Sequence, residues 1–192
     1  MSSSAWMFPT THTIAPYGCV KDVFTPAQCE EIIRIGTSNQ LHESSVGADR
    51  SDSVRRCRSN IIEVKGNERI FKALSSAAIL VNDQYFSFDL AGFAEGIIFL
   101  EYNAPAGKYE THVDCEYGSP VRKLSMSVQL SDEAAYVGGD VVLTYSSKGQ
   151  LYAPRTQGSL VAFPSYVLHE VKPITEGTRY SLVGWITGPQ FK

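Results

Sequence analysis

The chain has 192 residues, of which 43% are hydrophobic and 19% charged, and its net charge at pH 7 is -3. This composition is typical of a globular domain with a sizeable core and excludes a disordered chain. The weakly acidic balance also excludes a general electrostatic affinity for nucleic acid or an anionic membrane. We therefore expect a single domain over residues 1–192 and no nucleic-acid partner.

Targeting and cross-linking signals are not expected either. The N-terminal residues lack a basic region followed by an apolar run, so we expect no secretory signal. No apolar run approaches the roughly 18 residues of a membrane span, so we expect no membrane contact. The cysteines are widely spaced without a CxxC motif, which makes a disulfide framework or a zinc site improbable. A reduced, cytoplasmic protein follows as the expectation.

Two helices are expected in the first half of the chain. In "FTPAQCEEIIRIGTSN", residues 24–39, Thr25 can cap the helix, Pro26 suits the first turn, and apolar residues recur at helical spacing. Helical periodicity returns in "NERIFKALSSAAILVNDQYF", residues 67–86. Between them, "SSVGADRSDSVRRCRSN", residues 44–60, is polar and is expected to form a loop.

After about residue 90 the sequence changes to short segments rich in β-branched and aromatic residues, separated by Gly, Pro or Asp. A helical part over about residues 20–90, followed by many closely spaced strands over about 91–188, predicts an α+β chain whose second half is a β-sandwich or jelly roll. The predicted strands are 96–103, 121–130, 140–145, 158–164, 167–173 and 178–187.

The stretch "YETHVDCEY", residues 109–117, places His112 and Asp114 one residue apart. On a strand these two side chains would share one face, with Cα atoms roughly 6.5 Å apart. Such a pair can bind a metal ion or simply hydrogen-bond to each other, and the second is commoner. His169, in the late strand 167–173, would complete a face of two histidines and one carboxylate, which leaves three positions open on ferrous iron.

A basic residue follows the second histidine. The segment "HEVKPITEGTRYS" is interpreted as strand, turn and strand. If Val171 pairs with Arg179, then His169, Arg179 and Ser181 face the same way, with Arg179 about 8 Å from His169 along the diagonal. A dicarboxylate bound to the metal at one end could meet the guanidinium fork at the other, and Ser181 would add a donor.

The segments "YNAPAGKYETHVD" and "LHEVKPITEGTRYSLVGW" closely resemble the iron(II)- and 2-oxoglutarate-dependent oxygenases, in particular the prolyl 4-hydroxylase-like branch. The resemblance covers roughly residues 95–188, and "GGDVVLTY" is similar to the family's strand after a double glycine. It implies a double-stranded β-helix (jelly roll) core with the N-terminal helices packed on one sheet. It also implies Fe(II), 2-oxoglutarate as cosubstrate and O2, with ascorbate as a candidate reductant.

By this resemblance, His112, Asp114 and His169 bind the iron. Arg179 binds the distal carboxylate of 2-oxoglutarate, and Tyr102 hydrogen-bonds the same group. The expected catalytic set is therefore the three metal ligands together with Arg179.

The resemblance also implies substrate contacts. Tyr109 and Trp185 occupy the places of the two aromatic residues that flank a substrate proline, although a lone core aromatic would be the commoner reading of each. In the expected loop over residues 44–60, Arg55, Arg56 and Arg58 could grip a substrate backbone or carboxylate, or could simply be solvated.

The chain departs from some family members at one strand. They carry a further tyrosine near 2-oxoglutarate on the strand after the aspartate, whereas residues 121–130 contain none. We therefore expect Leu124, Met126 or Val128 to line the pocket.

The implied reaction is hydroxylation of an unactivated C–H bond, coupled to conversion of 2-oxoglutarate to succinate and CO2. Asp114 fills the position that related halogenases leave open for chloride, which favours hydroxylation. The aromatic pair points to a prolyl residue of a peptide or protein as substrate, and a free amino acid or small metabolite is the alternative. A non-catalytic jelly-roll binding protein is the rival from another class, and a cupin-type metal enzyme is disfavoured because no His-x-His occurs. No oligomeric state is predicted.

Overall fold

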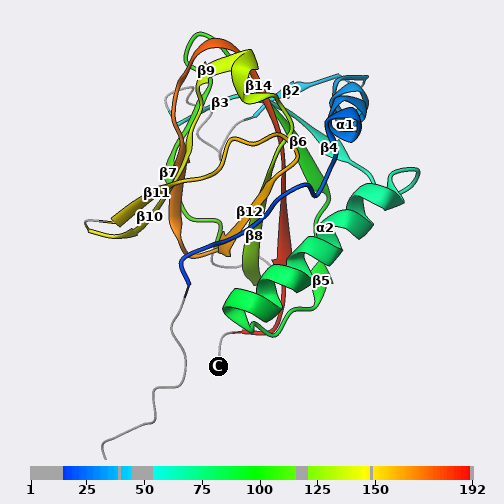
Figure 1. Cartoon of the computed structure of the whole chain (residues 1–192), viewed down its shortest axis with the longest axis vertical. Coiled ribbons are helices and arrows are strands. Elements are labelled where there is room, and N and C mark those ends of the chain that lie inside the picture. Colours follow the sequence, from blue (N-terminus) through cyan, green and yellow to red (C-terminus); the bar gives the residue numbers. More distant parts are fainter. Residues whose placement is uncertain (1–14, 39, 45–53, 116–120, 148, 191–192) are drawn as a thin grey trace, which may run out of the picture.

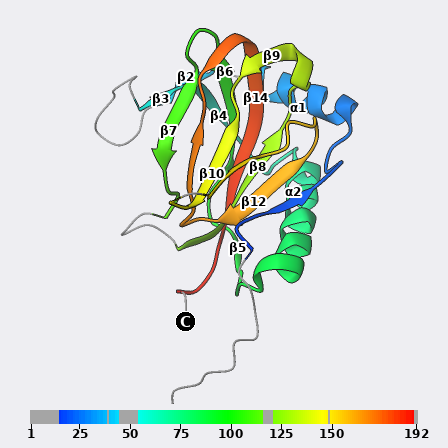
Figure 2. The same ribbon diagram turned by 60° about the vertical axis from the view of Figure 1, so that its left-hand side comes forward.

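Two antiparallel β-sheets face each other in this protein, and both helices cover the outer side of the larger sheet (Figure 1). The computed structural model describes residues 15–38, 40–44, 54–115, 121–147 and 149–190. Turning the molecule by 60° shows the smaller sheet on the side opposite to the helices (Figure 2). This arrangement confirms the predicted jelly roll with N-terminal helices packed on one sheet.

Helix α1 (Pro26–Ser38) begins at the predicted cap. The backbone N–H of Thr25 donates to Gln28 Oε1 over 2.8 Å, and the backbone N–H of Gln28 donates to Thr25 Oγ1 over 3.3 Å, so the two residues satisfy each other's free amides. A Cβ at Gly36 would lie 2.3 Å from the Phe99 ring. Glycine at this position therefore lets α1 approach the sheet closely.

Helix α2 (Glu68–Val81) is followed by a π-helical turn, Asn82–Phe86, and together they cover the predicted helical segment. The apolar residues that recur at helical spacing are the buried ones, so the amphipathic face of α2 supplies one side of the core beneath the helices. They are Ile70, Phe71, Leu74, Ala77, Ala78 and Val81.

The larger sheet has the strand order β1-β12-β8-β14-β6-β4-β2, and β5 and β9 also pair with β14. The smaller sheet has the order β11-β10-β13-β7-β3. A short 3-10 turn, Glu133–Ala135, precedes β9. In the larger sheet the strands are β1 (Gly18–Val20), β2 (His42–Glu43), β4 (Arg58–Ile62), β5 (Gly92–Phe93), β6 (Ile97–Asn103), β8 (Arg122–Gln129), β9 (Tyr136–Gly138), β12 (Leu160–Pro164) and β14 (Ile174–Thr187). In the smaller sheet they are β3 (Arg55–Arg56), β7 (Lys108–His112), β10 (Val141–Ser146), β11 (Gly149–Tyr152) and β13 (Leu168–Val171).

All six strands predicted after residue 90 are present, as β6, β8, β10, β12, β13 and β14. The expected loop over residues 44–60 is wrong at its C-terminal end, where β3 and β4 form. Its residues 45–53 lie outside the described part of the chain. Because β4 pairs with β6 and β3 pairs with β7, the N-terminal half completes an edge of each sheet.

The predicted hairpin between residues 169 and 181 is also wrong. Strand β13 pairs with β7 and β10 in the smaller sheet, whereas β14 pairs with β6 and β8 in the larger one. The turn at Pro173 therefore carries the chain from one sheet to the other. Arg179 lies opposite Tyr102 rather than Val171. His169 and Arg179 consequently come from facing sheets.

Two clusters of buried apolar residues result from this layering. One fills the space between the helices and the larger sheet, and the other lies between the two sheets. Within the described ranges, no helix is long and apolar enough to cross a membrane.

Candidate active site

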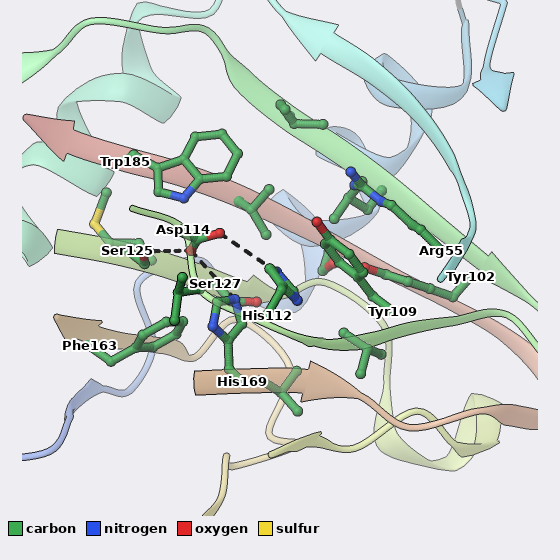
Figure 3. Close-up of a pocket in the computed structure, with 18 of the residues that line it drawn as sticks. Arg55, Tyr102, Tyr109, His112, Asp114, Ser125, Ser127, Phe163, His169 and Trp185 are labelled. Carbon is green, nitrogen blue, oxygen red and sulfur yellow. Dashed lines mark hydrogen bonds and ion pairs between the residues drawn. The ribbon is translucent and has the colours of Figure 1, made fainter. Parts of the chain in front are cut away.

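A cavity of about 240 Å³ opens between the two sheets (Figure 3). Its walls combine apolar side chains with a small number of polar and charged groups, which is the usual composition of a small-molecule site. The residues that line it are Arg55, Ile98, Leu100, Tyr102, Tyr109, His112, Val113, Asp114, Arg122, Ser125, Met126, Ser127, Val141, Phe163, His169, Val171, Arg179, Ser181, Val183 and Trp185.

Three potential metal ligands converge at one end of this cavity. His112 ends β7 and lies opposite His169 of β13, and Asp114 follows in the turn after β7. One Asp114 carboxylate oxygen is 3.7 Å from His112 Nε2, and the other is 3.5 Å from His169 Nε2. One ligand atom from each of the three residues lies within 4.8 Å of the others. The third ligand that the sequence suggested is therefore adjacent to the first two (Figure 3).

The other ring nitrogen of each histidine is held by the backbone. His112 Nδ1 is 2.8 Å from the carbonyl oxygen of Glu110, and His169 Nδ1 is 3.0 Å from that of Val167. A carbonyl can only accept, so each Nδ1 donates to the backbone, and each Nε2 is the ring nitrogen that faces Asp114. Burial, together with the neighbouring His169, lowers the pKa of His112 to about 4, so this imidazole is neutral at pH 7. Two imidazoles and one carboxylate are the donor set that fits ferrous iron.

The Asp114 carboxylate has its own support. Ser125 Oγ donates to Asp114 Oδ2 over 2.6 Å, and Ser165 Oγ is hydrogen-bonded to Ser125 at 2.9 Å. The backbone N–H of Asp114 donates to the Ser165 carbonyl at 3.0 Å, and its carbonyl accepts from Arg122 at 3.2 Å. The carboxylate that would bind the metal is thus fixed from both its side chain and its backbone.

Arg179 and Tyr102 form the opposite wall, from neighbouring strands of the larger sheet. Arg179 is only 3% exposed, and its Nε donates to Gln129 Oε1 over 3.0 Å. Its Nη1 lies 3.5 Å from Ser181 Oγ, and the guanidinium carbon lies 5.6 Å from the centre of the Tyr102 ring. Burial raises the pKa of Tyr102, so its hydroxyl keeps its proton and can donate. Arginine, tyrosine and serine side chains therefore line one wall of the cavity together.

The orientation of Gln129 is fixed by its remaining hydrogen bonds. Its Nε2 donates to the carbonyl oxygen of Ser131 and to the hydroxyl of Tyr136, both over 3.0 Å. Beside this group, Gly139 has a φ of +68°, and a Cβ there would lie 2.1 Å from Ile174 and 3.2 Å from the Arg179 side chain. The double glycine in the sequence thus allows the chain to pass close to the buried arginine.

The aromatic residues Tyr109 and Trp185 both line the cavity. The Tyr109 ring stacks on His112 with 3.6 Å between ring centroids, and the Arg55 guanidinium carbon lies 4.6 Å from the Tyr109 centroid. The Trp185 ring lies 3.9 Å from the guanidinium carbon of Arg122, which also hydrogen-bonds Glu95 through two nitrogens at 2.7 and 2.5 Å.

Two expectations for cavity residues need correction. Leu124 and Val128 pack in the core beneath the helices, while Ser125, Ser127 and the Gln129 amide face the other side of β8. Of the three apolar residues proposed, Met126 alone lies among those that line the cavity. The alternation in "LSMSVQL" carried this information, because period-2 patterning puts its polar residues on one face.

Two of the predicted substrate residues, Arg56 and Arg58, do not line the cavity. Arg56 is exposed in β3. Arg58 is exposed in β4, and its guanidinium pairs with Glu101 on the neighbouring strand, with Nε donating over 2.7 Å. Arg122 and Gln129, by contrast, were missed because nothing in their local sequence distinguishes them from other polar strand residues.

The chain is similar to known oxygenases in sequence and in fold. Residues 97–187 match the model of the 2OG-Fe(II) oxygenase superfamily. A PKHD-type hydroxylase of Prochlorococcus marinus (strain MIT 9515) is 30% identical over 159 residues, which are 80% of this chain and 70% of that protein. The chain spans about half the length of the first curated relatives that it matches, 54% of one and 47% of another.

Solved structures show the same fold. A Pseudomonas putida prolyl-4-hydroxylase superposes with a TM-score of 0.73 at 19% identity, covering 91% of this chain and 94% of that one. A Trichoplax adhaerens prolyl hydroxylase, solved in complex with a peptide fragment of the hypoxia-inducible factor oxygen degradation domain, gives 0.72 at 16% identity, covering 90% and 83%. The chain belongs to the 2OG-Fe(II) oxygenase superfamily, among relatives that include PKHD-type hydroxylases.

Proposed function

We propose that the protein is an iron(II)- and 2-oxoglutarate-dependent dioxygenase that hydroxylates an unactivated C–H bond. The observation that carries the proposal is the pairing, within one cavity, of the His112, Asp114 and His169 cluster with the buried Arg179 on the facing sheet. A hydrogen-bonded His–Asp pair would need neither a second histidine beside it nor a buried guanidinium across from it.

The residues of the cavity would have different roles. His112, Asp114 and His169 would hold the ferrous ion by three ligands on one side, which leaves room for cosubstrate and O2. Bound iron would supply the oxidation by O2, in which one oxygen atom enters succinate as 2-oxoglutarate loses CO2 and the other enters the new hydroxyl group of the substrate. Arg179 would bind the distal carboxylate of 2-oxoglutarate by two parallel hydrogen bonds, with Tyr102 and Ser181 as further donors.

A prolyl residue of a peptide or protein is the proposed substrate. Tyr109 and Trp185 both line the cavity that also holds the metal cluster, and a pyrrolidine ring packs well against aromatic side chains. The relatives named above support this choice, since they are hydroxylases of the PKHD and prolyl types. A cytoplasmic location and ascorbate as reductant stay part of the proposal, and the absence of disulfides among the described cysteines suits a reducing compartment.

Succinate formation tests the chemistry. Purified protein with Fe(II), O2 and 2-oxoglutarate should form succinate, and His112→Ala should abolish both succinate formation and tight Fe(II) binding. His42→Ala is the matched control, because His42 lies exposed in β2, away from the cavity. Succinate formation equal in wild type and His112→Ala would contradict the proposal.

Peptides test the substrate. Proline-containing peptides should stimulate succinate formation and gain one oxygen by mass spectrometry, and matched alanine peptides should not. Iron-dependent succinate formation that only free amino acids or small metabolites stimulate would replace the prolyl assignment by the metabolite one. Binding of peptides without iron or succinate formation would instead favour a non-catalytic binding protein.

A further inference from the structure

The cavity lining contains one positive charge that has no counter-charge among the described residues and that the proposed cosubstrate would not neutralise. Three arginines line the cavity. Arg122 is paired with Glu95, and Arg179 would be neutralised by the distal carboxylate of 2-oxoglutarate. Arg55 has no carboxylate partner within the described ranges; its Nε donates to Cys57 Sγ at 3.1 Å and its guanidinium lies over the Tyr109 ring.

A bound ferrous ion would not change this excess of positive charge at Arg55. The Asp114 carboxylate and the second carboxylate of 2-oxoglutarate together balance the two charges of a ferrous ion. The cavity loaded with metal and cosubstrate therefore keeps a net charge of one unit on Arg55. Removing a half-buried cation from water is costly unless an anion or strong hydrogen-bond acceptors replace the water.

The Arg55 side chain is built to receive an anion. Arginine has five N–H donors, and the one at Nε donates to Cys57 while the side chain lines the cavity. Strand pairing places Arg55 directly opposite Tyr109, and the contacts with Cys57 and the tyrosine ring hold the guanidinium in one orientation. A guanidinium held in this way matches the two oxygens of a carboxylate.

The position of Arg55 also sets how far this anion lies from the reacting carbon. The Tyr109 ring lies between Arg55 and His112 (Figure 3), with 4.6 Å from its centroid to the guanidinium carbon and 3.6 Å to the histidine ring. An extended peptide covers roughly 3.3–3.6 Å per residue. A peptide whose target residue lies at the metal would thus bring a residue about two positions away to Arg55.

We propose that Arg55 is a specificity-determining residue that binds a carboxylate of the primary substrate, an aspartate or glutamate within two residues of the hydroxylated residue. This inference rests on the proposed function, because it takes the metal cluster as the place of reaction. It narrows the substrate class to acidic proline-containing peptides.

The test compares peptides that differ only in charge. Fluorescein-labelled proline peptides carry an aspartate at one of the two positions on either side of the proline, and each has an asparagine counterpart. Binding is measured by fluorescence anisotropy without O2, in the presence of Fe(II) and 2-oxoglutarate. Wild type should bind at least one aspartate peptide about tenfold more tightly than its asparagine counterpart, as expected for a charge pair worth about 1.4 kcal/mol.

Three variants test whether the preference for aspartate peptides depends on Arg55. Arg55→Gln should lose the preference, and Arg55→Lys should keep part of it because it retains the charge without the fork. Arg56→Gln is the matched control and should keep all of it, because Arg56 is the next residue on β3, exposed and outside the cavity. The inference is overturned if wild type binds both peptides equally or binds none. It is also overturned if Arg55→Gln raises only the KM for 2-oxoglutarate, which would make Arg55 a cosubstrate residue.

The outcomes distinguish failure of this inference from failure of the proposed function. A wild type that discriminates the peptides through Arg55 but never forms succinate would keep the carboxylate site and contradict the oxygenase. A wild type that forms succinate with equal affinity for both peptides would keep the oxygenase and contradict the carboxylate site.

Discussion

Gln129 Oε1 accepts a hydrogen bond from Arg179 Nε at 3.0 Å, deep inside the molecule. Both side chains are almost fully buried, at 5% and 3% exposure, and Tyr136 and Ser131 hold the other end of the amide. The carboxamide thus fixes one edge of the guanidinium while leaving its charge available. We interpret Gln129 as the residue that positions Arg179 for a carboxylate.

Replacing Gln129 by glutamate should weaken 2-oxoglutarate binding. A carboxylate at this position would pair with Arg179 and compete with the cosubstrate, so we expect the KM for 2-oxoglutarate to rise by about tenfold or more, the equivalent of at least 1.4 kcal/mol. Gln150→Glu, an exposed change on β11, should leave this KM unaltered. An unchanged KM in Gln129→Glu would show that the amide does not act through Arg179.

Ser125→Ala should reduce metal affinity without removing a ligand. The Ser125 hydroxyl orients the Asp114 carboxylate at 2.6 Å, and loss of such a hydrogen bond typically costs 10- to 100-fold, or ~1.4–2.7 kcal/mol, in metal binding. Co(II) titration followed by visible absorption measures this affinity. Ser127→Ala is the control, since Ser127 also lines the cavity but lies two residues further along β8. Equal affinities of the two variants would contradict the positioning role.

The metal-free protein should lose stability in mild acid. The pKa of His112 falls from its ordinary value of 6.5 to about 4 in the folded state, mainly through burial. Between these values the unfolded chain binds a proton that the folded chain does not, so the contribution is fully present above pH 6.5 and is lost as the pH falls toward 4. Urea unfolding at pH 7 and pH 5 measures the loss, which should be smaller in His112→Gln than in wild type. The exposed variant His42→Gln should behave as wild type, and a His112→Gln protein that loses just as much stability would refute the assignment.

Gly36→Ala should destabilise the packing of α1 on the sheet. The added Cβ would lie 2.3 Å from the Phe99 ring, so helix and ring must separate, at a cost of about 1–3 kcal/mol of unfolding free energy. Arg34→Ala, on the exposed side of the same helix, should change it by less than about 0.5 kcal/mol. Equal stability of the two variants in urea would mean that the helix does not depend on this close approach.

Local patterns in the sequence were sufficient to predict the helices and most strands and to identify the three candidate metal ligands. The capping residue Thr25, the helical spacing in α2 and the six β-rich segments identified elements that the structure contains, because such signals depend only on neighbouring residues. The His-x-Asp stretch and the later His169 were recognised through their spacing in a family motif. Their side chains are indeed adjacent.

Pairing between distant strands decided the rest. The sequence led us to place His169 and Arg179 on one hairpin, whereas the chain crosses between sheets after β13 and the two residues face each other. The same pairing brings Arg55 into the cavity opposite Tyr109, while Arg58 contacts Glu101 instead. Strand order and register are set by contacts far apart in the chain, and a shift of one residue exchanges the two faces of a strand. For that reason the sequence by itself determined which groups are candidates for the chemistry, and only the tertiary structure decided which of them meet.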